Sequence, residues 1–242
     1  MKILVISDIH ANLTALEAVL AAAGEVDATW CLGDLVGYGP DPNECVERVR
    51  KLPRLSCVMG NHDAAVVNSK NIDKFNDDAE RSIRFTVEKL TADNLSFLKK
   101  QREKIITQTV TLAHGSPRSP MWEYLVEPFV ALMNFAHFNT QLAFVGHSHL
   151  PISFHMEAHG DKVIRTIAEG NLELPIPGRA ILNPGSVGQP RDRDPRASYG
   201  IFDPEESIWR IFRVEYDIRA VQQRIYEAGL PEREALRLAD GW

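Results

Sequence analysis

Residues of the types that bind metal ions follow several short apolar runs in this chain. The loops after the first three runs contain Asp8-Ile9-His10, Gly33-Asp34 and Gly60-Asn61-His62-Asp63. Two later runs are followed by His114-Gly115 and Gly146-His147-Ser148-His149. Five of the eight histidines lie in these loops, and the two imidazoles of the last motif point the same way because they stand two residues apart on a strand end. Together the five motifs predict a metal-binding site.

The elements that carry the first three motifs alternate between strands and helices. The expected strands are Lys2–Ser7, Ala28–Leu32 and Leu55–Met59, and the expected helices are Asn12–Ala23 with Asn12 as its cap, Asn43–Lys51 and Asp77–Lys100. Such alternation implies parallel strands with right-handed crossovers. Because ligands of open α/β sheets gather beyond the carboxyl ends of the strands, the loops are expected to converge on one crevice. The glycines let the backbone turn close to a bound ion.

Each motif alone also has an ordinary structural explanation. Asp8 and His10 are compatible with a helix cap and a packed histidine, and Gly33-Asp34 is typical of a turn. The loop 60–63 is equally typical of a turn followed by a helix N-cap. The combination favours a functional site, because five independent coincidences would all have to fall at strand ends.

After Lys104 the pattern changes to short strands, several of them joined by tight turns. The expected strands are Thr109–Ala113, Leu142–Val145, Ile152–His155, Val163–Ala168, Ala180–Leu182, Tyr199–Phe202 and Ser207–Val214, with a late helix at Asp217–Glu227. His155 and His159 flank a predicted surface hairpin at 157–161. These strands predict a second, mostly antiparallel sheet. The expected architecture is one α/β domain over residues 1–242, in which two sheets lie face to face with helices outside.

Composition excludes several classes of protein. The chain has 242 residues, and its 27 basic and 33 acidic residues give a formal charge of −6, which argues against extensive binding to nucleic acid. The longest apolar run, near 15–23, is far shorter than the ~20 residues of a membrane span, so no membrane association is expected. Three cysteines without a C-x-x-C pair suggest neither disulfides nor a thiolate zinc site and favour a cytoplasmic location.

The order of the five motifs resembles the signature of the calcineurin-like metallophosphoesterases. The loop Asn183-Pro184-Gly185-Ser186-Val187-Gly188 is similar to that of the small bacterial phosphodiesterase branch of this superfamily. The resemblance implies a four-layer αββα sandwich of two mixed β-sheets. It also implies two divalent metal ions, with one ligand set of Asp8, His10, Asp34 and His149, and a second set of Asp34, Asn61, His114 and His147.

The ligands implied by the resemblance explain the chemistry. Two divalent ions about 3.5–4 Å apart lower the pKa of a shared water and clamp the phosphoryl oxygens. Imidazole, carboxylate and amide ligands suit manganese, iron, zinc, cobalt or nickel, and the resemblance favours manganese. His62, beside ligand Asn61, is the candidate catalytic residue that donates to a phosphate oxygen or protonates the leaving group. The alternative for His62 is a surface turn histidine.

The loop after Asp34 departs from the protein phosphatase branch, where a phosphate-binding arginine follows a spacer residue. Gly37 and Tyr38 occupy those two places here. Because an arginine grips a dianionic monoester in bidentate fashion, its absence favours a small phosphodiester as substrate. A phosphoprotein phosphatase and a dinucleoside polyphosphate hydrolase are the enzymatic alternatives, and a nuclease is disfavoured by the lack of a basic track. A protein-binding scaffold of the same fold is the non-enzymatic alternative.

Several residues outside the ligand set are candidates for substrate contact. We expect Asn61, His62, Tyr38 and Arg118 to contact the substrate. Arg191, Arg193 and Arg196 either meet substrate anions or belong to a salt-bridged surface loop, since Asp192 and Asp194 alternate with them. Trp122, Tyr124 and Phe129 either form a lid over the metals or belong to the core. The sequence does not predict the oligomeric state.

Overall fold

The first β-sheet contains the three parallel strands that the sequence predicts. This computed structural model describes residues 1–157 and 162–242, and of residues 69–71 only the backbone, so His159 and most of the predicted hairpin lie outside it. The parallel strands are β1 (Ile3–Ile6), β2 (Ala28–Cys31) and β3 (Leu55–Cys57), and their connections contain α1 (Leu13–Ala23) and α2 (Pro42–Arg50). The Asn12 side chain caps α1 as expected, because it accepts a hydrogen bond from the Ala15 N–H at 3.0 Å.

Three strands from the C-terminal half complete this sheet. They are β9 (Leu172–Pro175), β11 (Ala197–Asp203) and β12 (Ile208–Val214), and the strand order is β3-β2-β1-β11-β12-β9. The prediction that every strand after Lys104 belongs to the second sheet is therefore wrong. β11 pairs antiparallel with β1 and is buried over six of its seven residues. A strand buried in this way has the same apolar pattern whichever sheet it joins. Packing between distant segments therefore decides which strand it pairs with.

The second sheet is mixed as well. Its strands are β4 (Lys104–Ile106), β5 (Val110–Ala113), β6 (Leu142–Phe144), β7 (Pro151–Met156), β8 (Val163–Ile167) and β10 (Ala180–Pro184), in the order β4-β5-β6-β10-β7-β8. β5, β6 and β10 are parallel to one another, whereas β4, β7 and β8 pair antiparallel with their neighbours. Two six-stranded mixed sheets flanked by helices confirm the predicted sandwich.

The core between the sheets is apolar and aromatic. The ring centroids of Trp30 and Phe144 are 5.0 Å apart, and those of Phe144 and Trp209 are 5.5 Å apart. Gly200 of β11 leaves room for the Trp209 indole, since a Cβ at residue 200 would lie 1.9 Å from that ring. Trp209 is fully buried. Burial of this aromatic surface stabilises the packing of the two sheets, with a free energy of roughly 25 cal/mol per Å² of apolar area.

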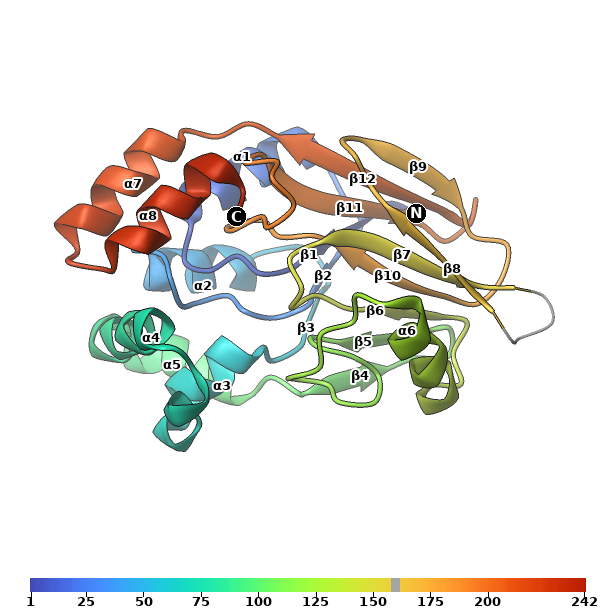
Figure 1. Ribbon diagram of the computed structural model, residues 1–242, viewed down its shortest axis with the longest axis horizontal. Coiled ribbons are helices and arrows are strands. Elements are labelled where there is room, and N and C mark those ends of the chain that lie inside the picture. The colour runs from blue at the N-terminus through green and yellow to red at the C-terminus, as the bar shows by residue number, and fades with distance from the viewer. Residues whose placement is uncertain (158–161) are drawn as a thin grey trace.

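Helices cover the outer faces of the two sheets. Figure 1 shows α7 and α8, drawn in red, beside α1, with α3, α4 and α5 below them and α6 against the second sheet. The remaining helices are α3 (Asn61–Val67), η1 (Ser69–Lys74), α4 (Asp77–Lys89), α5 (Ala92–Lys99), α6 (Pro128–Asn134), η2 (Phe135–His137), α7 (Ile218–Glu227) and α8 (Glu232–Asp240). Within the described residues, none of the helices has the length and apolar character that crossing a membrane requires.

Two helix predictions need correction. Residues 60–63 were expected to form a loop, but α3 begins at Asn61 because Asp63, in its first turn, accepts hydrogen bonds that close the turn. The single helix expected over residues 77–100 is two helices, because Thr91 accepts a hydrogen bond from the Asn94 N–H at 3.3 Å and starts α5. The sequence patterns also missed β4, β9, α6 and α8.

Candidate metal centre

The five polar loops converge, as expected, where β1, β2, β3, β5 and β6 end. Their side chains form three groups in which potential ligand atoms lie within 4.8 Å of one another. All the predicted metal ligands and His62 are at most 4% exposed: Asp8, His10, Asp34, Asn61, His62, His114, His147 and His149. Burial of so many polar groups is costly unless each finds a partner. Because Asp34, His62 and His147 each keep a buried polar atom without a hydrogen-bond partner among the described residues, we expect this cluster to bind a ligand.

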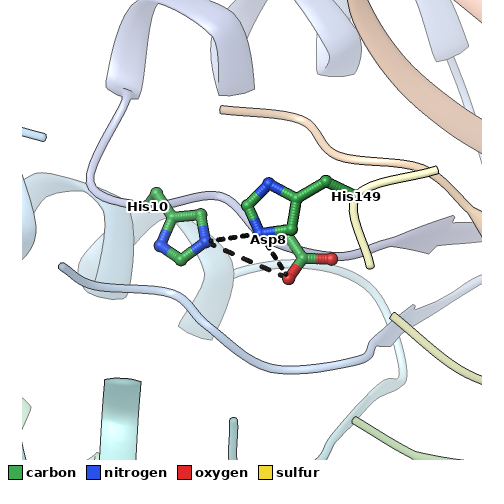
Figure 2. Close-up of side chains that lie close together, drawn as sticks. All are labelled: Asp8, His10 and His149. Atoms are coloured by element: carbon green, nitrogen blue, oxygen red, sulfur yellow. Dashed lines mark hydrogen bonds and ion pairs between the residues drawn. The ribbon is translucent and has the colours of Figure 1, made fainter. Parts of the chain in front are cut away.

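Asp8, His10 and His149 form the first group, whose polar atoms face one another in Figure 2. The Nε2 atoms of the two rings are 3.1 Å apart, and Oδ1 of Asp8 lies 3.4 Å from Nε2 of His149. The opposite nitrogen of each ring, Nδ1, lies 3.2 Å from the Val36 carbonyl in His10 and 2.5 Å from the Gln189 carbonyl in His149. Each Nδ1–H therefore donates to a carbonyl, and each Nε2 presents a lone pair.

Two facing lone pairs require a cation or a proton between them. Burial lowers the pKa of both His10 and His149 well below the usual value, so neither ring holds the extra proton that a direct bond between them would need. A metal ion satisfies both nitrogens and Asp8 at once. The carbonyls that fix the tautomers act as the outer partners that metal-binding histidines commonly have.

His114 organises the second group. Its Nδ1 lies 2.8 Å from the Leu32 carbonyl, and its Nε2 faces Oδ1 of Asn61 at 2.9 Å, Nδ1 of His147 at 3.2 Å and Oδ2 of Asp34 at 3.3 Å. Burial lowers the pKa of His114, but the negative charge of Asp34 outweighs it and raises the pKa to about 9. In the metal-free protein Nε2 of His114 therefore carries a proton, and this proton lies where the three other ligand atoms converge. A cation fits at the same point.

Asp34 lies between the two groups. Its Oδ1 accepts a hydrogen bond from the His62 N–H at 2.9 Å. Its Oδ2 is buried without a hydrogen-bond partner among the described residues, 3.6 Å from Nε2 of His10 and 3.3 Å from Nε2 of His114. Burial opposes ionisation of Asp34, yet the facing His114 and His62 rings lower its pKa below the usual value. An ionised oxygen in this position suits a carboxylate shared by two metal ions.

The backbone at five ligand positions is left-handed. The φ angles are 55° at Asp8, 49° at His10, 54° at Asp34, 63° at His147 and 59° at His149. For a residue other than glycine this conformation costs roughly 1–2 kcal/mol. Such strain concentrates at functional sites, where the surrounding structure holds it in place.

His62 belongs to the third group, together with His10 and Asp34. Its ring centroid is 4.9 Å from that of His10, 4.5 Å from Tyr38 and 4.7 Å from Phe75. Burial lowers the pKa of His62 to about 4, so the ring is neutral near pH 7. Gly37 makes room for it, since a Cβ there would lie 2.4 Å from Nδ1 of His62 and the backbone has φ +88°. This contact accounts for the glycine in the loop after Asp34.

Asp63 is a positioning residue that the sequence interpretation did not identify. Its two carboxylate oxygens accept hydrogen bonds from four backbone N–H groups, those of Asp34 at 2.9 Å, Leu35 at 2.9 Å, Val36 at 3.3 Å and Gly60 at 3.1 Å. The carboxylate therefore joins the loop of Asp34 to the start of α3. An acidic residue three positions after Gly60 is the signal that pointed to this role, since it is typical of a capping box.

A cavity of about 180 Å³ opens beside the two groups. It is lined by Asp34, Tyr38, Asn61, His62, Lys74, Phe75, Asn76, Trp122, Tyr124, His147, His149 and Arg191. Three of the four predicted substrate-contacting residues, Tyr38, Asn61 and His62, are therefore together. Arg118 is not among the lining residues and forms an ion pair with Glu123, so its role stays a prediction. Trp122 and Tyr124 face the cavity, whereas Phe129 is 72% exposed.

Comparison with known proteins identifies the family. The model of the calcineurin-like phosphoesterase superfamily domain matches residues 1–207. The chain belongs to this superfamily. It is 42% identical to an uncharacterized protein of Methanocaldococcus jannaschii over 238 residues, which cover 95% of this chain and 94% of that protein. A metallophosphoesterase from Sphaerobacter thermophilus has a similar structure, with 45% identity, a TM-score of 0.91, and coverage of 100% of this chain and 99% of that one.

A shorter match involves a relative that is named as an enzyme. The phosphoesterase is 35% identical to a symmetrical bis(5'-nucleosyl)-tetraphosphatase of Pectobacterium atrosepticum over 88 residues. These residues are 32% of this chain and 31% of the tetraphosphatase. The helices α7 and α8 lie beyond the residues that the family model matches.

Proposed function

We propose that this phosphoesterase is a two-metal phosphodiesterase that acts on a small phosphodiester. Asp8, His10, Asp34 and His149 would hold one divalent ion, and Asp34, Asn61, His114 and His147 the other. When bound, the two ions would supply a water of lowered pKa and polarise the phosphoryl oxygens. The mixture of imidazole, carboxylate and amide ligands fits manganese, iron, zinc, cobalt or nickel, and manganese is the ion that we propose.

The aromatic lining of the cavity is the observation that carries the diester assignment. Tyr38 and Phe75 pack on two sides of the His62 ring, and Trp122 lies 5.6 Å from Phe75 between centroids. A phosphodiester carries two organic substituents, one of which leaves and one of which stays, and aromatic walls offer apolar surface to the second. The loop after Asp34 supplies the Tyr38 ring where the protein phosphatase branch has an arginine that grips a monoester dianion, and the guanidinium that lines this cavity, that of Arg191, comes from a different loop.

We propose His62 as the catalytic residue that meets the substrate. Its ring lines the cavity and is neutral near pH 7, so it donates a hydrogen bond from N–H to a phosphate oxygen or to the leaving oxygen. The His62→Ala variant is expected to lose roughly 10²- to 10⁴-fold in turnover with its metal content unchanged. The exposed His137 of η2 offers a control, since His137→Ala is expected to keep full activity. Full activity of His62→Ala would remove His62 from the mechanism.

The substrate class is tested by two chromogenic esters. Protein loaded with Mn²⁺ is expected to hydrolyse bis(p-nitrophenyl) phosphate with a higher kcat/KM than p-nitrophenyl phosphate, and the chelated protein is expected to hydrolyse neither. A preference for the monoester would favour the phosphoprotein phosphatase alternative. Absence of metal-dependent hydrolysis of both esters would instead favour a protein-binding scaffold.

A dinucleoside polyphosphate hydrolase is the second candidate. The partial similarity to the symmetrical bis(5'-nucleosyl)-tetraphosphatase favours it, and the aromatic walls of the cavity suit a nucleobase as well as an ester group. Hydrolysis of diadenosine tetraphosphate, measured beside the two chromogenic esters, separates this candidate from the diesterase. A kcat/KM for the polyphosphate well above that for the diester would make it the better assignment.

A further inference from the structure

We propose that Arg191 is a specificity-determining residue that binds a phosphate oxygen of the substrate, and that Glu234 of α8 positions it through Gln189. The proposal rests on the proposed phosphoesterase function, because it concerns the same cavity. It assigns to the substrate an anionic contact that is separate from the metal ligands.

Arg191 lines the cavity together with His62, Asp34 and His149. Its guanidinium carbon is 5.8 Å from the centroid of the Tyr38 ring, and its Nη2 lies 3.5 Å from the Tyr38 hydroxyl. Its Nε is buried and has no hydrogen-bond partner among the described residues. A buried guanidinium N–H without an acceptor is costly unless a ligand supplies one.

The other charged residues of this loop already have partners, which distinguishes Arg191 from them. Asp192 forms an ion pair with the buried Arg213, and Asp194 forms one with Arg196 at 2.6 Å. Arg193 lies over the Trp242 ring, 5.8 Å from its centroid. The ion pair of Arg196 matches the salt-bridged loop that the sequence suggests, whereas Arg193 packs on an aromatic ring. The hydrogen bonds of Arg191, by contrast, are to two neutral groups, Gln189 and Tyr38.

Gln189 connects Arg191 to the C-terminal helix α8. Its Oε1 accepts a hydrogen bond from Nη2 of Arg191 at 2.8 Å, and its Nε2 donates to Oε2 of Glu234 at 2.7 Å. Glu234 is 2% exposed. Because a carboxylate only accepts, it fixes the orientation of the amide, so that the amide oxygen faces Arg191. The backbone carbonyl of Gln189 also accepts a hydrogen bond from Nδ1–H of His149. The same residue therefore positions both Arg191 and a candidate metal ligand.

A phosphate oxygen is the acceptor that this arrangement suits. The planar guanidinium matches phosphate geometry, and hydrogen bonds between charged partners are the strong ones. The oxygen belongs either to the phosphate that reacts or to a second phosphate of the same substrate. Since α8 lies beyond the residues that define the superfamily domain, the contact would distinguish this phosphoesterase from members that lack such a helix.

The test measures anion binding directly and is independent of turnover. Inorganic phosphate and pyrophosphate are titrated into Mn²⁺-loaded protein by calorimetry, for the wild type and for Arg191→Gln. Loss of a hydrogen bond to a charged group, about 1.5–3 kcal/mol, corresponds to roughly a 10- to 100-fold rise in Kd. A rise for both anions assigns Arg191 to the reacting phosphate, and a rise for pyrophosphate alone assigns it to a second phosphate. Arg193→Gln is the matched control from the same loop and is expected to leave both Kd values unchanged.

Glu234 is tested in the background of the arginine variant. Glu234→Ala is expected to raise the same Kd as Arg191→Gln, whereas the double variant is expected to bind the anion no more weakly than Arg191→Gln alone. If Glu234 only stabilises the fold, its effect on binding would instead persist in the double variant. Glu234→Gln serves the same comparison if the alanine variant does not fold.

The proposal fails if Arg191→Gln leaves both Kd values unchanged, or if the wild type binds neither anion. These outcomes differ from failure of the proposed function, which would show as binding of anions without hydrolysis of any ester.

Discussion

Replacement of Asp63 by asparagine tests how the metal centre is supported. The carboxylate accepts four backbone N–H hydrogen bonds, two on each oxygen. Asparagine has nearly the same size, but one of its two terminal groups is an NH₂, which donates and cannot accept. Whichever way the amide turns, two backbone N–H groups are left facing a donor in a buried site.

The expected loss of stability follows from these two unpaired N–H groups. An unsatisfied buried donor costs about 1–3 kcal/mol, so two of them lower the free energy of unfolding of Asp63→Asn by about 2–6 kcal/mol. In one orientation of the amide the Asp34 N–H loses its acceptor, and in the other the N–H groups of Leu35 and Val36 lose theirs. The loop of Asp34 therefore loses part of its support in either case. Loss of such an outer contact is expected to weaken metal binding by roughly 10- to 100-fold.

The assays are urea unfolding of the metal-free protein and Mn²⁺ titration by calorimetry. Asp93→Asn is the matched control, because Asp93 is exposed in the first turn of α5 and should contribute only a helix-dipole effect, about 0.3–1 kcal/mol. An Asp63→Asn protein as stable as the Asp93→Asn protein, with unchanged metal affinity, would refute the reasoning that the carboxylate holds the Asp34 loop.

Three further predictions concern the same centre. Mn²⁺ at 100 times its Kd should raise the free energy of unfolding by about 2.7 kcal/mol per site, and a chelator should reverse this in urea titrations. Burial lowers the pKa of His62 to about 4 and of His147 to about 3, so at these residues the unfolded chain binds more protons than the folded chain below pH 6.5. Burial raises the pKa of Asp8 and Asp63 to about 7, which contributes with the opposite sign. The histidine contribution to the free energy of unfolding of the metal-free protein should fall as the pH falls from 6.5 toward 4. At His62 this amounts to roughly 3 kcal/mol, and the pH dependence should flatten in His62→Ala. A Cβ at Gly60 would lie 2.0 Å from Oδ1 of Asp34, so Gly60→Ala should weaken Mn²⁺ binding in calorimetry, whereas Gly178→Ala, with open space around it, should not.

The convergence of the candidate ligand residues was predictable because all of them lie in segments that follow apolar strands. A strand of four or five residues fixes where the next side chain stands, and the carboxyl ends of β1 and β2 must share an edge once they are parallel. The helices around Leu13–Ala23 and Ile218–Glu227 were predictable for a similar reason, since their apolar spacing and their caps, Asn12 and Asp217, are local signals.

The remaining features depend on contacts between distant residues. The place of β11 beside β1 joins Ile3 to Phe202, and no local pattern reports which sheet a buried strand enters. The three arginines after Gly188 have similar neighbours in sequence, yet Arg191 alone among them lines the described cavity. Arg191 is connected through Gln189 to Glu234, which lies 43 residues further along the chain.

The left-handed backbone at five candidate ligand positions limits which substitutions can both stabilise this protein and keep its proposed function. Glycine at any of them would relieve roughly 1–2 kcal/mol of backbone strain, and it would also delete the ligand. A search for thermal stability alone would therefore favour glycine at the residues on which the chemistry depends. If these residues hold metal ions as proposed, the active protein has to remain below the stability that its own fold permits, and bound metal would offset that deficit.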